Sequence, residues 1–481
     1  MIQSFIYTTE RNNYYLYDDQ SRLSLLIHPE IKNAHENKKN VNKYYLKKYN
    51  YLKKHGFFSK SNFVEFATIT DKMVKESIIN TEQIVFEVTD SCNLNCKYCG
   101  LGELYEGFDI RSDNKINIYQ AELLLKYIYK LKVENNNNKL MIGFYGGEPL
   151  MNFKFIKQFI EVVNHLNYDK KIEIGYSMTT NATLVHKYVD FLVANKFRLL
   201  ISLDGNEINN SYRVFKKNKK NSFQKVIDNI DMIQKNHTKY FDSHIMFNAV
   251  LHNQNSVKDI YEYIYTRYQK IPIISELKRR NIKPEREGIV ENLYHSRRIS
   301  ESEYIKEDSI QIPVTHPTSL AFVELSDFLT QFSINYYLYN VNALLFVEEK
   351  YYPTSTCLPF AKRIFLTTNN KLLPCEQVNF KYALGKIEEK VMIDLQSIAR
   401  RYNFYYNHLG KVCAHCYAYR FCGECMLQIN YLNKLNVEDF VCSKFFDQKS
   451  FGIKLYRIFS FIENHPNLFF QILENEQTNI Y

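Results

Sequence analysis

Three cysteines lie within eight residues in the stretch TDSCNLNCKYCG, at Cys92, Cys96 and Cys99, and the next cysteine is Cys357. A structural zinc site or a closed iron-sulfur cluster needs four ligands. Three thiolates on one short loop can instead hold three corners of a cubane [4Fe-4S] cluster and leave the fourth iron open to another molecule. An open coordination position is typical of catalytic rather than structural metal sites.

Two other interpretations fit the same spacing. Offsets of four and seven also place side chains on one face of a helix, and Cys is common in protein cores. The three cysteines could also belong to a partial zinc site. Loop-forming residues that directly follow a strand-like segment favour a loop. These residues are Asp90, Ser91, Asn93 and Asn95.

Strand-like segments alternate with amphipathic segments from residue 83 onward. The strands and helices that they predict must hold the cysteines in place. The strand candidates are residues 83–88, 139–146, 172–178, 198–205 and 245–251, with apolar residues at helical spacing between them. The order predicts parallel strands covered by helices, in a barrel or an open sheet. In such folds, chemistry gathers at the carboxyl ends of the strands.

Polar motifs follow those strand ends. Gly146 and Gly147 would let the backbone approach a ligand closely, and Glu148 is a carboxylate suited to an ammonium group. Taken alone, this Gly-Gly-Glu-Pro turn could be an ordinary loop. The other polar residues at the expected rim are Thr180, Asn181, Ser202 and Asp204, with Arg213 eleven residues past Ser202.

This ordered set resembles the radical S-adenosylmethionine (radical SAM) enzymes, which carry CxxxCxxC with an aromatic residue before the last Cys. The resemblance implies that Cys92, Cys96 and Cys99 hold a [4Fe-4S] cluster whose open iron binds S-adenosylmethionine, and that the cluster's electron cleaves this cofactor to a 5′-deoxyadenosyl radical. It implies that Glu148 binds the methionine amino group, whereas Arg213 could bind a carboxylate or be a surface residue. The cofactor-binding set implied is Tyr98, Gly146, Gly147, Glu148, Pro149, Thr180, Asn181, Ser202, Asp204 and Arg213.

A second group of seven cysteines resembles the SPASM domain, a carboxy-terminal extension that houses two auxiliary [4Fe-4S] clusters. By position, Cys413, Cys416, Cys422 and Cys442 would close one cluster. Cys357, Cys375 and Cys425 would hold the other and leave an open iron or a non-cysteine ligand. A zinc ribbon is the alternative, because several of these cysteines are paired two residues apart.

The second group departs from the family pattern in two places. Two residues separate Cys422 from Cys425 where three are common, and Asn370 stands where a glycine is common. Because Asn also tolerates positive φ, we expect that turn to survive. Glu376 could act as a catalytic base that takes a proton from the substrate, or it could form a salt bridge.

Composition limits the setting of this chemistry. The chain has 481 residues, 45% of them hydrophobic, and a net charge of +10. Its basic stretches, at 42–56 and 276–287, favour solvated surfaces over a nucleic-acid partner. No basic-then-apolar leader and no apolar run of about 18 residues is present, so we expect a cytoplasmic protein with reduced cysteines and no membrane partner.

The expected fold class is α/β, with a partial (β/α)6 TIM-like barrel. We expect a small α+β domain at 1–80, the radical SAM core with a bridging region at 81–350, the SPASM domain at 351–445 and a helical tail at 446–481. Residues 1–80 predict a three-stranded meander with helices, which resembles in arrangement the leader-recognition element of peptide maturases. Such an element would bind a leader by adding a strand to its edge, and a stabilising cap on the barrel is the alternative.

The resemblance implies an enzyme that installs a thioether or carbon-carbon crosslink in a ribosomally made precursor peptide. A reducing partner such as flavodoxin or ferredoxin would supply electrons. A sulfatase maturase, which oxidises Cys or Ser to formylglycine, is the alternative, although simple ones begin their barrel close to the chain start. A non-catalytic peptide-binding or regulatory protein with cluster or zinc sites is the alternative of another class.

Overall fold

The computed structural model divides the chain into two compact units. It describes residues 3–19, 23–58, 65–306, 320–327, 356–419, 422, 424–429, 432, 442, 444–467 and 469–470. Unit 1 contains the described residues of 1–68, 309–356 and 403–481, and unit 2 those of 69–308 and 357–402. Within unit 1, residues from both ends of the chain share one aromatic core.

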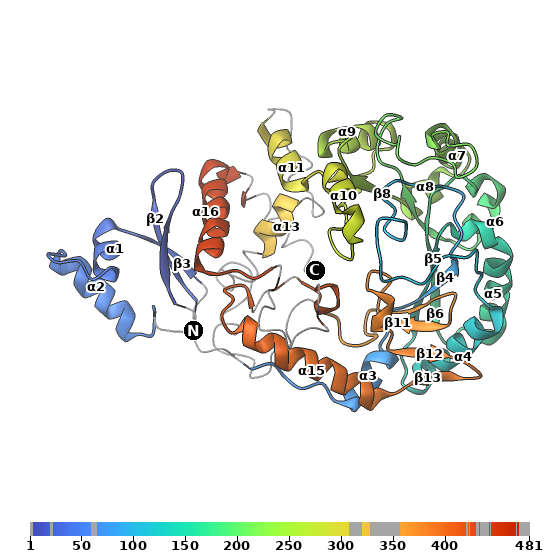
Figure 1. Ribbon diagram of the computed structural model, residues 1–481, viewed down its shortest axis with the longest axis horizontal. Helices are drawn as coiled ribbons and strands as arrows, with labels where there is room; N and C mark the ends of the chain where they lie inside the picture. The colour runs from blue at the N-terminus through green and yellow to red at the C-terminus, as the bar shows by residue number, and fades with distance from the viewer. Residues whose placement is uncertain are drawn as a thin grey trace. The chain divides into compact units, whose positions relative to one another are not determined.

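Unit 2 is built on a sheet of ten described strands (Figure 1). Six parallel strands follow one another in chain order: β4 (Gln83–Thr89), β5 (Lys139–Gly146), β6 (Glu173–Thr180), β7 (Arg198–Ser202), β8 (Ile245–Leu251) and β9 (Ile273–Glu276). Five of them lie where the sequence predicts strands. The sixth, β9, was missed because four residues are too few to establish an alternating pattern.

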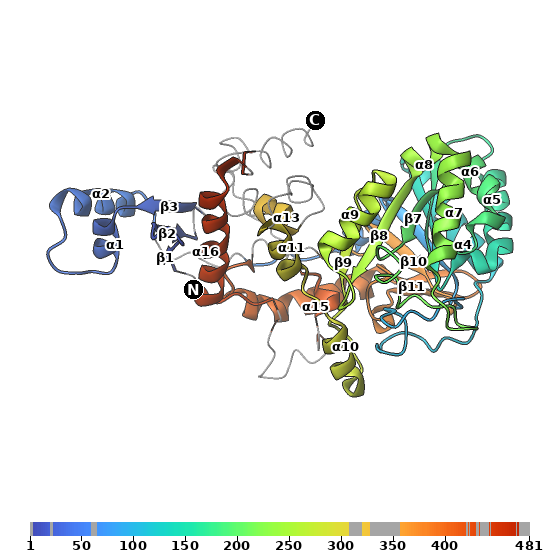
Figure 2. The ribbon, with the colours of Figure 1, turned by 90° about the horizontal axis from the view of Figure 1, so that it is seen from above.

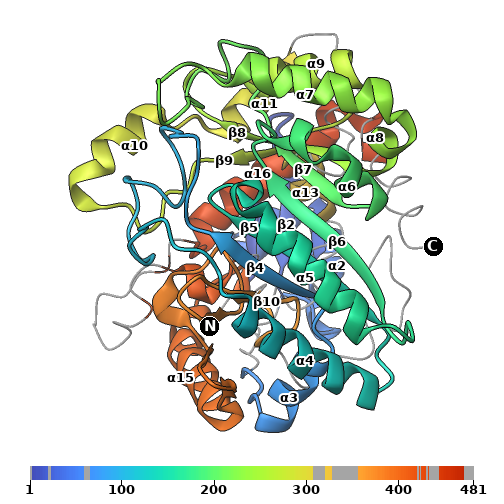
Figure 3. The same cartoon turned by 90° about the vertical axis from the view of Figure 1, so that its right-hand side faces the viewer.

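Helices pack along the parallel strands (Figures 2 and 3). They are α4 (Ile118–Glu134), α5 (Phe153–Leu166), α6 (Val189–Ala194), α7 (Phe223–Asn236), α8 (Thr238–His244) and α9 (Val257–Tyr268). In α5, Phe159 lies 4.6 Å, centroid to centroid, from Phe86 of β4. The strand-helix order and the parallel pairing confirm the predicted partial (β/α)6 architecture.

The sheet continues beyond β4 with strands from the cysteine-rich region. β10 (Arg363–Leu366) pairs parallel with β4, and β11 (Lys371–Leu373), β12 (Gly385–Ile387) and β13 (Val391–Ile393) follow antiparallel. The β10–β11 hairpin turns at Asn370, whose φ is +62°, which confirms the expected role of this asparagine. Cys375 therefore follows a strand of the same sheet that carries the first three cysteines.

Further described helices lie outside the strand-helix repeat and outside the meander with its covering helices. The α-helices are α3 (Asp71–Ile79), α10 (Glu287–Leu293), α11 (Arg297–Lys306), α13 (Leu320–Asp327) and α15 (Leu395–Cys413). The 3₁₀ helices are η1 (Pro149–Asn152), η2 (Val185–Lys187), η3 (Pro284–Arg286), η6 (Phe380–Tyr382) and η8 (Met426–Gln428). No described helix is long and apolar enough to cross a membrane.

Unit 1 begins with the predicted antiparallel meander of β1 (Phe5–Thr8), β2 (Tyr14–Asp18) and β3 (Leu23–Ile27). On one face, Leu16 and Ile27 pack with Tyr49 in a core shared with α1 (Pro29–His35) and α2 (Lys43–Lys54). On the other face lies α16 (Gln448–Asn464), from the far end of the chain.

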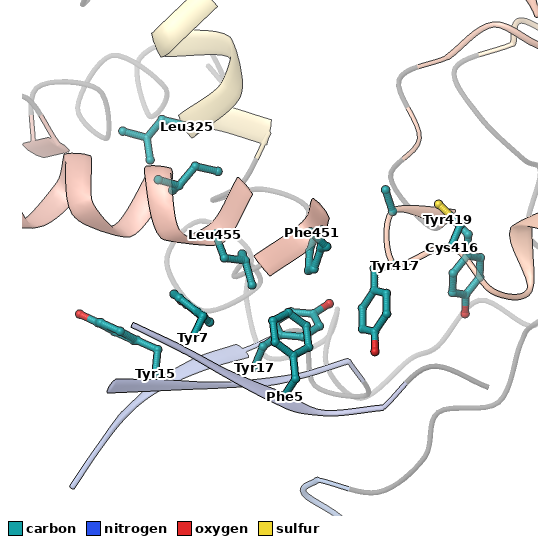
Figure 4. Close-up of a cluster of buried hydrophobic side chains, with 12 residues drawn as sticks. Phe5, Tyr7, Tyr15, Tyr17, Leu325, Cys416, Tyr417, Tyr419, Phe451 and Leu455 are labelled. Atoms are coloured by element: carbon teal, nitrogen blue, oxygen red, sulfur yellow. The ribbon is translucent and has the colours of Figure 1, made fainter. Parts of the chain in front are cut away.

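Aromatic rings join the meander to α16 and to the segment that follows Cys413 (Figure 4). The ring centroids of Phe5 and Tyr17 lie 6.3 and 5.1 Å from that of Phe451 on α16. Tyr417 stacks on the same Phe451 at 5.6 Å, and its hydroxyl donates to the carbonyl of Gln3 at 2.9 Å. The cysteines of this segment are therefore held by residues from both chain ends.

Candidate active site

The loop after β4 carries Cys92, Cys96 and Cys99, all as free thiols. Main-chain hydrogen bonds to residues 212–216 brace it, such as the 2.8 Å bond from Asn95 N to the Val214 carbonyl. Burial raises the pKa of Cys92 to about 11 and that of Cys96 to about 12. Because coordination to a metal deprotonates a thiol, these cysteines need a metal partner to act as thiolates.

The turn after β5 lies against this loop. The N–H of Gly147 donates to the Thr89 carbonyl at 2.8 Å, and the N–H of Glu148 donates to the Ser91 carbonyl at 2.9 Å. A Cβ on Gly147 would lie 1.8 Å from the Ser91 carbonyl oxygen, and Gly146 has a φ of +132°. The two glycines therefore let the turn after β5 pack closely against the backbone of the cysteine loop.

Glu148 is fully buried beside that turn. Its carboxylate accepts hydrogen bonds from Leu150 N at 3.1 Å, Thr180 Oγ1 at 2.8 Å and Asn181 N at 2.8 Å. Burial raises its pKa to about 7 despite these three donors. No cation forms a salt bridge with Glu148 in the described part of the chain, so an ammonium group entering this pocket would favour the charged carboxylate.

Asn181 links Glu148 to the cysteine loop. Its Nδ2 donates to Asn93 Oδ1 at 2.9 Å and lies 3.8 Å from Cys92 Sγ. The N–H of Leu94 also donates to Cys92 Sγ, at 3.4 Å. Pro149 opens η1 directly after Glu148, and Ser202 ends β7 in a half-buried position. The rim residues predicted from the strand ends therefore lie at the same edge of the sheet.

Asp204 and Arg213 form a buried pair at this edge. Arg213 donates from Nε and Nη2 to the two carboxylate oxygens at 2.9 and 3.0 Å, and the Tyr98 hydroxyl also donates to Asp204. Burial alone would raise the pKa of Asp204, but Arg213 holds it well below its usual range. Arg213 is thus not the surface arginine of the alternative interpretation. In this structure its carboxylate partner is Asp204.

His252 belongs to the same network and was missed from the sequence. It is fully buried after β8, with Nε2 3.7 Å from Asp204 Oδ2 and its ring stacked on Tyr98 at 5.4 Å. Its place at a strand end was the available signal, but a lone histidine gives no spacing to recognise.

Comparison with known families identifies the segment of the chain that carries this site. Residues 86–264 match the model of the radical SAM superfamily. This segment is a radical SAM domain. The family binds S-adenosylmethionine and a [4Fe-4S] cluster, and the three free thiols beside a buried, cation-free carboxylate fit both groups.

Relatives of the radical SAM domain carry different names. A cysteine-type anaerobic sulfatase-maturating enzyme of Clostridium novyi is 31% identical over 160 residues, 33% of this chain and 41% of the relative. The radical SAM cyclopropyl synthase TigE of Paramaledivibacter caminithermalis is 29% identical over 171 residues, 34% of each chain. The structure of anSMEcpe with bound AdoMet and Cp18Cys peptide aligns over 82% of this chain and 99% of its own, at 18% identity and a TM-score of 0.49. The sequence matches thus span less than half of either relative's length.

A second polar group lies near Cys99 of the radical SAM domain. Glu376 accepts from Arg363 Nη1 at 2.6 and 2.7 Å, so it forms a salt bridge, and its pKa is lowered because Arg363 outweighs the effect of burial. Lys278, after β9, has a pKa lowered by burial and interacts electrostatically with Glu376, Cys99 and Cys375. The described residues provide its ammonium group with no hydrogen bond or ion pair, although it lies 5.7 Å from the centroid of the Phe108 ring. Sequence reasoning missed Lys278 because β9 itself was missed.

The remaining cysteines are all free. Burial raises the pKa of Cys413, and the nearby Cys416, Cys422 and Cys442 raise it further, so these four thiols lie within electrostatic range of one another. The N–H of Phe446 donates to Cys416 Sγ at 3.4 Å. Among the described residues, no three His, Cys, Asp or Glu side chains are grouped closely enough to bind a single metal ion.

The other predicted set of cluster ligands, Cys357, Cys375 and Cys425, is divided between the two units. Cys357 and Cys375 both interact electrostatically with Arg363 in unit 2. Cys425 belongs to unit 1. The grouping of these three cysteines around one cluster therefore stays a prediction.

Proposed function

We propose that this chain is a radical SAM peptide maturase that installs a thioether or carbon-carbon crosslink in a ribosomally made precursor peptide. The main support is the buried Glu148, which among the described residues has no cation as a partner and lies beside three free cysteines at one edge of the radical SAM domain. When bound, the cluster supplies the electron that cleaves S-adenosylmethionine to a 5′-deoxyadenosyl radical.

The residues at this edge have separate roles in the proposal. Glu148 accepts the methionine ammonium group, while Thr180 and Asn181 orient its carboxylate. Gly146, Gly147 and Pro149 set the turn, and Ser202 contributes a polar contact from β7. Asp204 and Arg213 act through Tyr98, because Asp204 accepts a hydrogen bond from its hydroxyl and the Arg213 guanidinium lies 5.4 Å from the centroid of its ring.

The second cysteine group houses two auxiliary clusters in this proposal. Cys413, Cys416, Cys422 and Cys442 would bind one, and Cys357, Cys375 and Cys425 the other, within a SPASM domain at 351–445. Glu376 would be the proton acceptor for the substrate. Its salt bridge keeps it ionised, although a lowered pKa also makes it a weaker base.

The amino-terminal meander supports a peptide substrate. β1 and β3 are its outer strands, and an extended leader could add a strand to either edge. A formylglycine-forming oxidase is the second candidate, supported by the relatives named as sulfatase-maturating enzymes. The meander ahead of the barrel favours crosslinking, with flavodoxin or ferredoxin as the electron donor.

Two measurements test the proposal. Anaerobically reconstituted protein should bind about twelve iron atoms, whereas about four, or stoichiometric zinc, would contradict three clusters. With dithionite and S-adenosylmethionine it should form 5′-deoxyadenosine, and a Cys92→Ala, Cys96→Ala, Cys99→Ala variant should not.

The product identifies the reaction. With the precursor peptide, loss of two hydrogens without an aldehyde supports a crosslink, while an aldehyde that reacts with a hydrazide probe supports formylglycine. Absence of 5′-deoxyadenosine from fully loaded protein would support a non-catalytic binding protein instead.

A further inference from the structure

Helix α2 in unit 1 carries an uncompensated positive charge. It contains five lysines and no acidic residue, and all five are exposed. They are Lys43, Lys47, Lys48, Lys53 and Lys54. In the described part of the chain, none of them forms an ion pair with a carboxylate.

Two helices of unit 2 pair some of their lysines with glutamates. On α3, Lys72 pairs with Glu76. On α4, the Nζ of Lys126 lies 2.7 Å from Glu122 and that of Lys130 lies 3.8 Å from Glu134. All three are pairs spaced four residues apart, which stabilise a helix. Among the described residues, α2 differs from α3 and α4 in having no pair of this kind.

Most of the lysine charges on α2 do not stabilise the helix. Lys43 is the first helical residue, where the helix dipole disfavours a cation. Lys43 and Lys47 are one turn apart, so their like charges repel. Only Lys53 and Lys54, in the last turn, are placed favourably. Most of the lysines of α2 therefore do not stabilise the helix, and they leave it with a positively charged surface.

The outward face of α2 is a row of lysines beside a row of tyrosines. Tyr49 is buried in the core beneath the helix, and Leu52 packs against the same core. On the opposite side, Lys43, Lys47 and Lys54 follow one another at helical spacing. Tyr44 and Tyr51, seven residues apart, form the next row and are 60% and 63% exposed.

We propose that this face of α2 binds an acidic segment of the peptide substrate. The inference rests on the proposed peptide-modifying function and adds the chemistry of the segment that docks. Carboxylates would supply the counter-charges that the described residues do not place on α2, and the tyrosine rings would cover apolar carbons between them. From Lys43 to Lys54 the row is about 16 Å long, which an extended segment of about five residues spans.

A membrane surface does not fit the same face. A helix that lies in a bilayer interface inserts its apolar side, but the apolar side of α2 is occupied by the core around Tyr49. A nucleic acid would use the same lysines through its phosphates, so it is the rival that the experiment must separate.

The test uses full-length reconstituted protein and three fluorescein-labelled probes: a peptide with six glutamates, the same peptide with six lysines, and a single-stranded DNA of matched negative charge. Fluorescence anisotropy measures Kd against a Lys43→Gln, Lys47→Gln, Lys54→Gln variant. The control variant is Lys154→Gln, Lys157→Gln, Lys239→Gln, which removes the same charge from exposed positions in unit 2. Circular dichroism verifies folding, and a triple Lys→Arg variant restores charge at the α2 positions.

The glutamate peptide should bind the unaltered protein, weaken about tenfold in the α2 variant and change less than about twofold in the control. The Lys→Arg variant should bind like the unaltered protein. Equal loss in both Gln variants, or tighter binding of the DNA with loss confined to α2, would overturn the proposal. Formation of 5′-deoxyadenosine without peptide does not depend on α2, so it reports separately on the proposed function.

Discussion

Arg213 donates from two nitrogens to both carboxylate oxygens of Asp204, and both side chains are buried. Removing one partner would leave an uncompensated buried charge. We expect Arg213→Met to lower the free energy of unfolding by about 3–5 kcal/mol, measured by urea denaturation of the apoprotein.

The matched control is Arg279→Met, because Arg279 forms an exposed pair with Glu291. It should cost less than about 1 kcal/mol. A double variant, Asp204→Asn with Arg213→Met, should recover part of the loss. Equal costs at Arg213 and Arg279 would show that the buried pair contributes little to stability.

Glu148 should make stability depend on pH. Its pKa is raised by burial from 4.5 to about 7 in the folded protein. Because the folded-state pKa is raised, the contribution of Glu148 to the free energy of unfolding is fully present below the unfolded-state pKa of 4.5. This contribution is lost as the pH rises through about 7. Relative to Glu148→Gln, the unaltered apoprotein should lose about 3 kcal/mol between pH 4.5 and 8. Parallel pH profiles of the two proteins in urea would refute this assignment.

Gly147→Ala should disturb the cysteine loop. The new Cβ would meet the Ser91 carbonyl at 1.8 Å, so the backbone must shift. We expect about four fewer iron atoms per chain after reconstitution, measured by iron analysis. Gly288→Ala on α10 is the control, since its Cβ would meet no atom within 4 Å, and it should bind iron normally. Full iron loading of Gly147→Ala would contradict the close contact.

Lys278→Met should stabilise the apoprotein. The ammonium is largely buried, and its pKa is lowered by that burial. Methionine removes the desolvation cost at similar volume, so the free energy of unfolding should rise by about 1 kcal/mol or more. In the loaded protein, loss of a positive charge near Cys99 should make the first cluster harder to reduce, with a more negative midpoint potential in an EPR-monitored titration. Unchanged stability and potential would mean that Lys278 is solvated.

Five of the six parallel strands, β4 to β8, were predictable because each is a largely apolar run followed by a helical period. The positions of Cys92, Glu148 and Asn181 at strand ends followed from that order, since parallel strands place their carboxyl ends at one edge. The sequence did not reveal Lys278 or His252, because single residues carry no spacing. It also did not reveal that Asp204 would pair with Arg213, because that contact depends on how the loop after β7 folds.

The division of the chain was the hardest feature to predict. Local patterns separate residues 1–80 from the carboxy-terminal tail, whereas Phe5 and Phe451 share a core through contacts hundreds of residues apart. Periodicity describes which face of a strand or helix is apolar. It does not say which distant segment covers that face.

The core around Phe5, Tyr17, Tyr417 and Phe451 also fixes the order of events during synthesis. The meander leaves the ribosome first, but the rings that cover one of its faces arrive only after α16 has been made. Residues 83–276 can meanwhile complete their parallel strands from contacts between neighbouring segments. Unit 1 therefore finishes folding last, and an interrupted chain would expose the aromatic face of its first three strands.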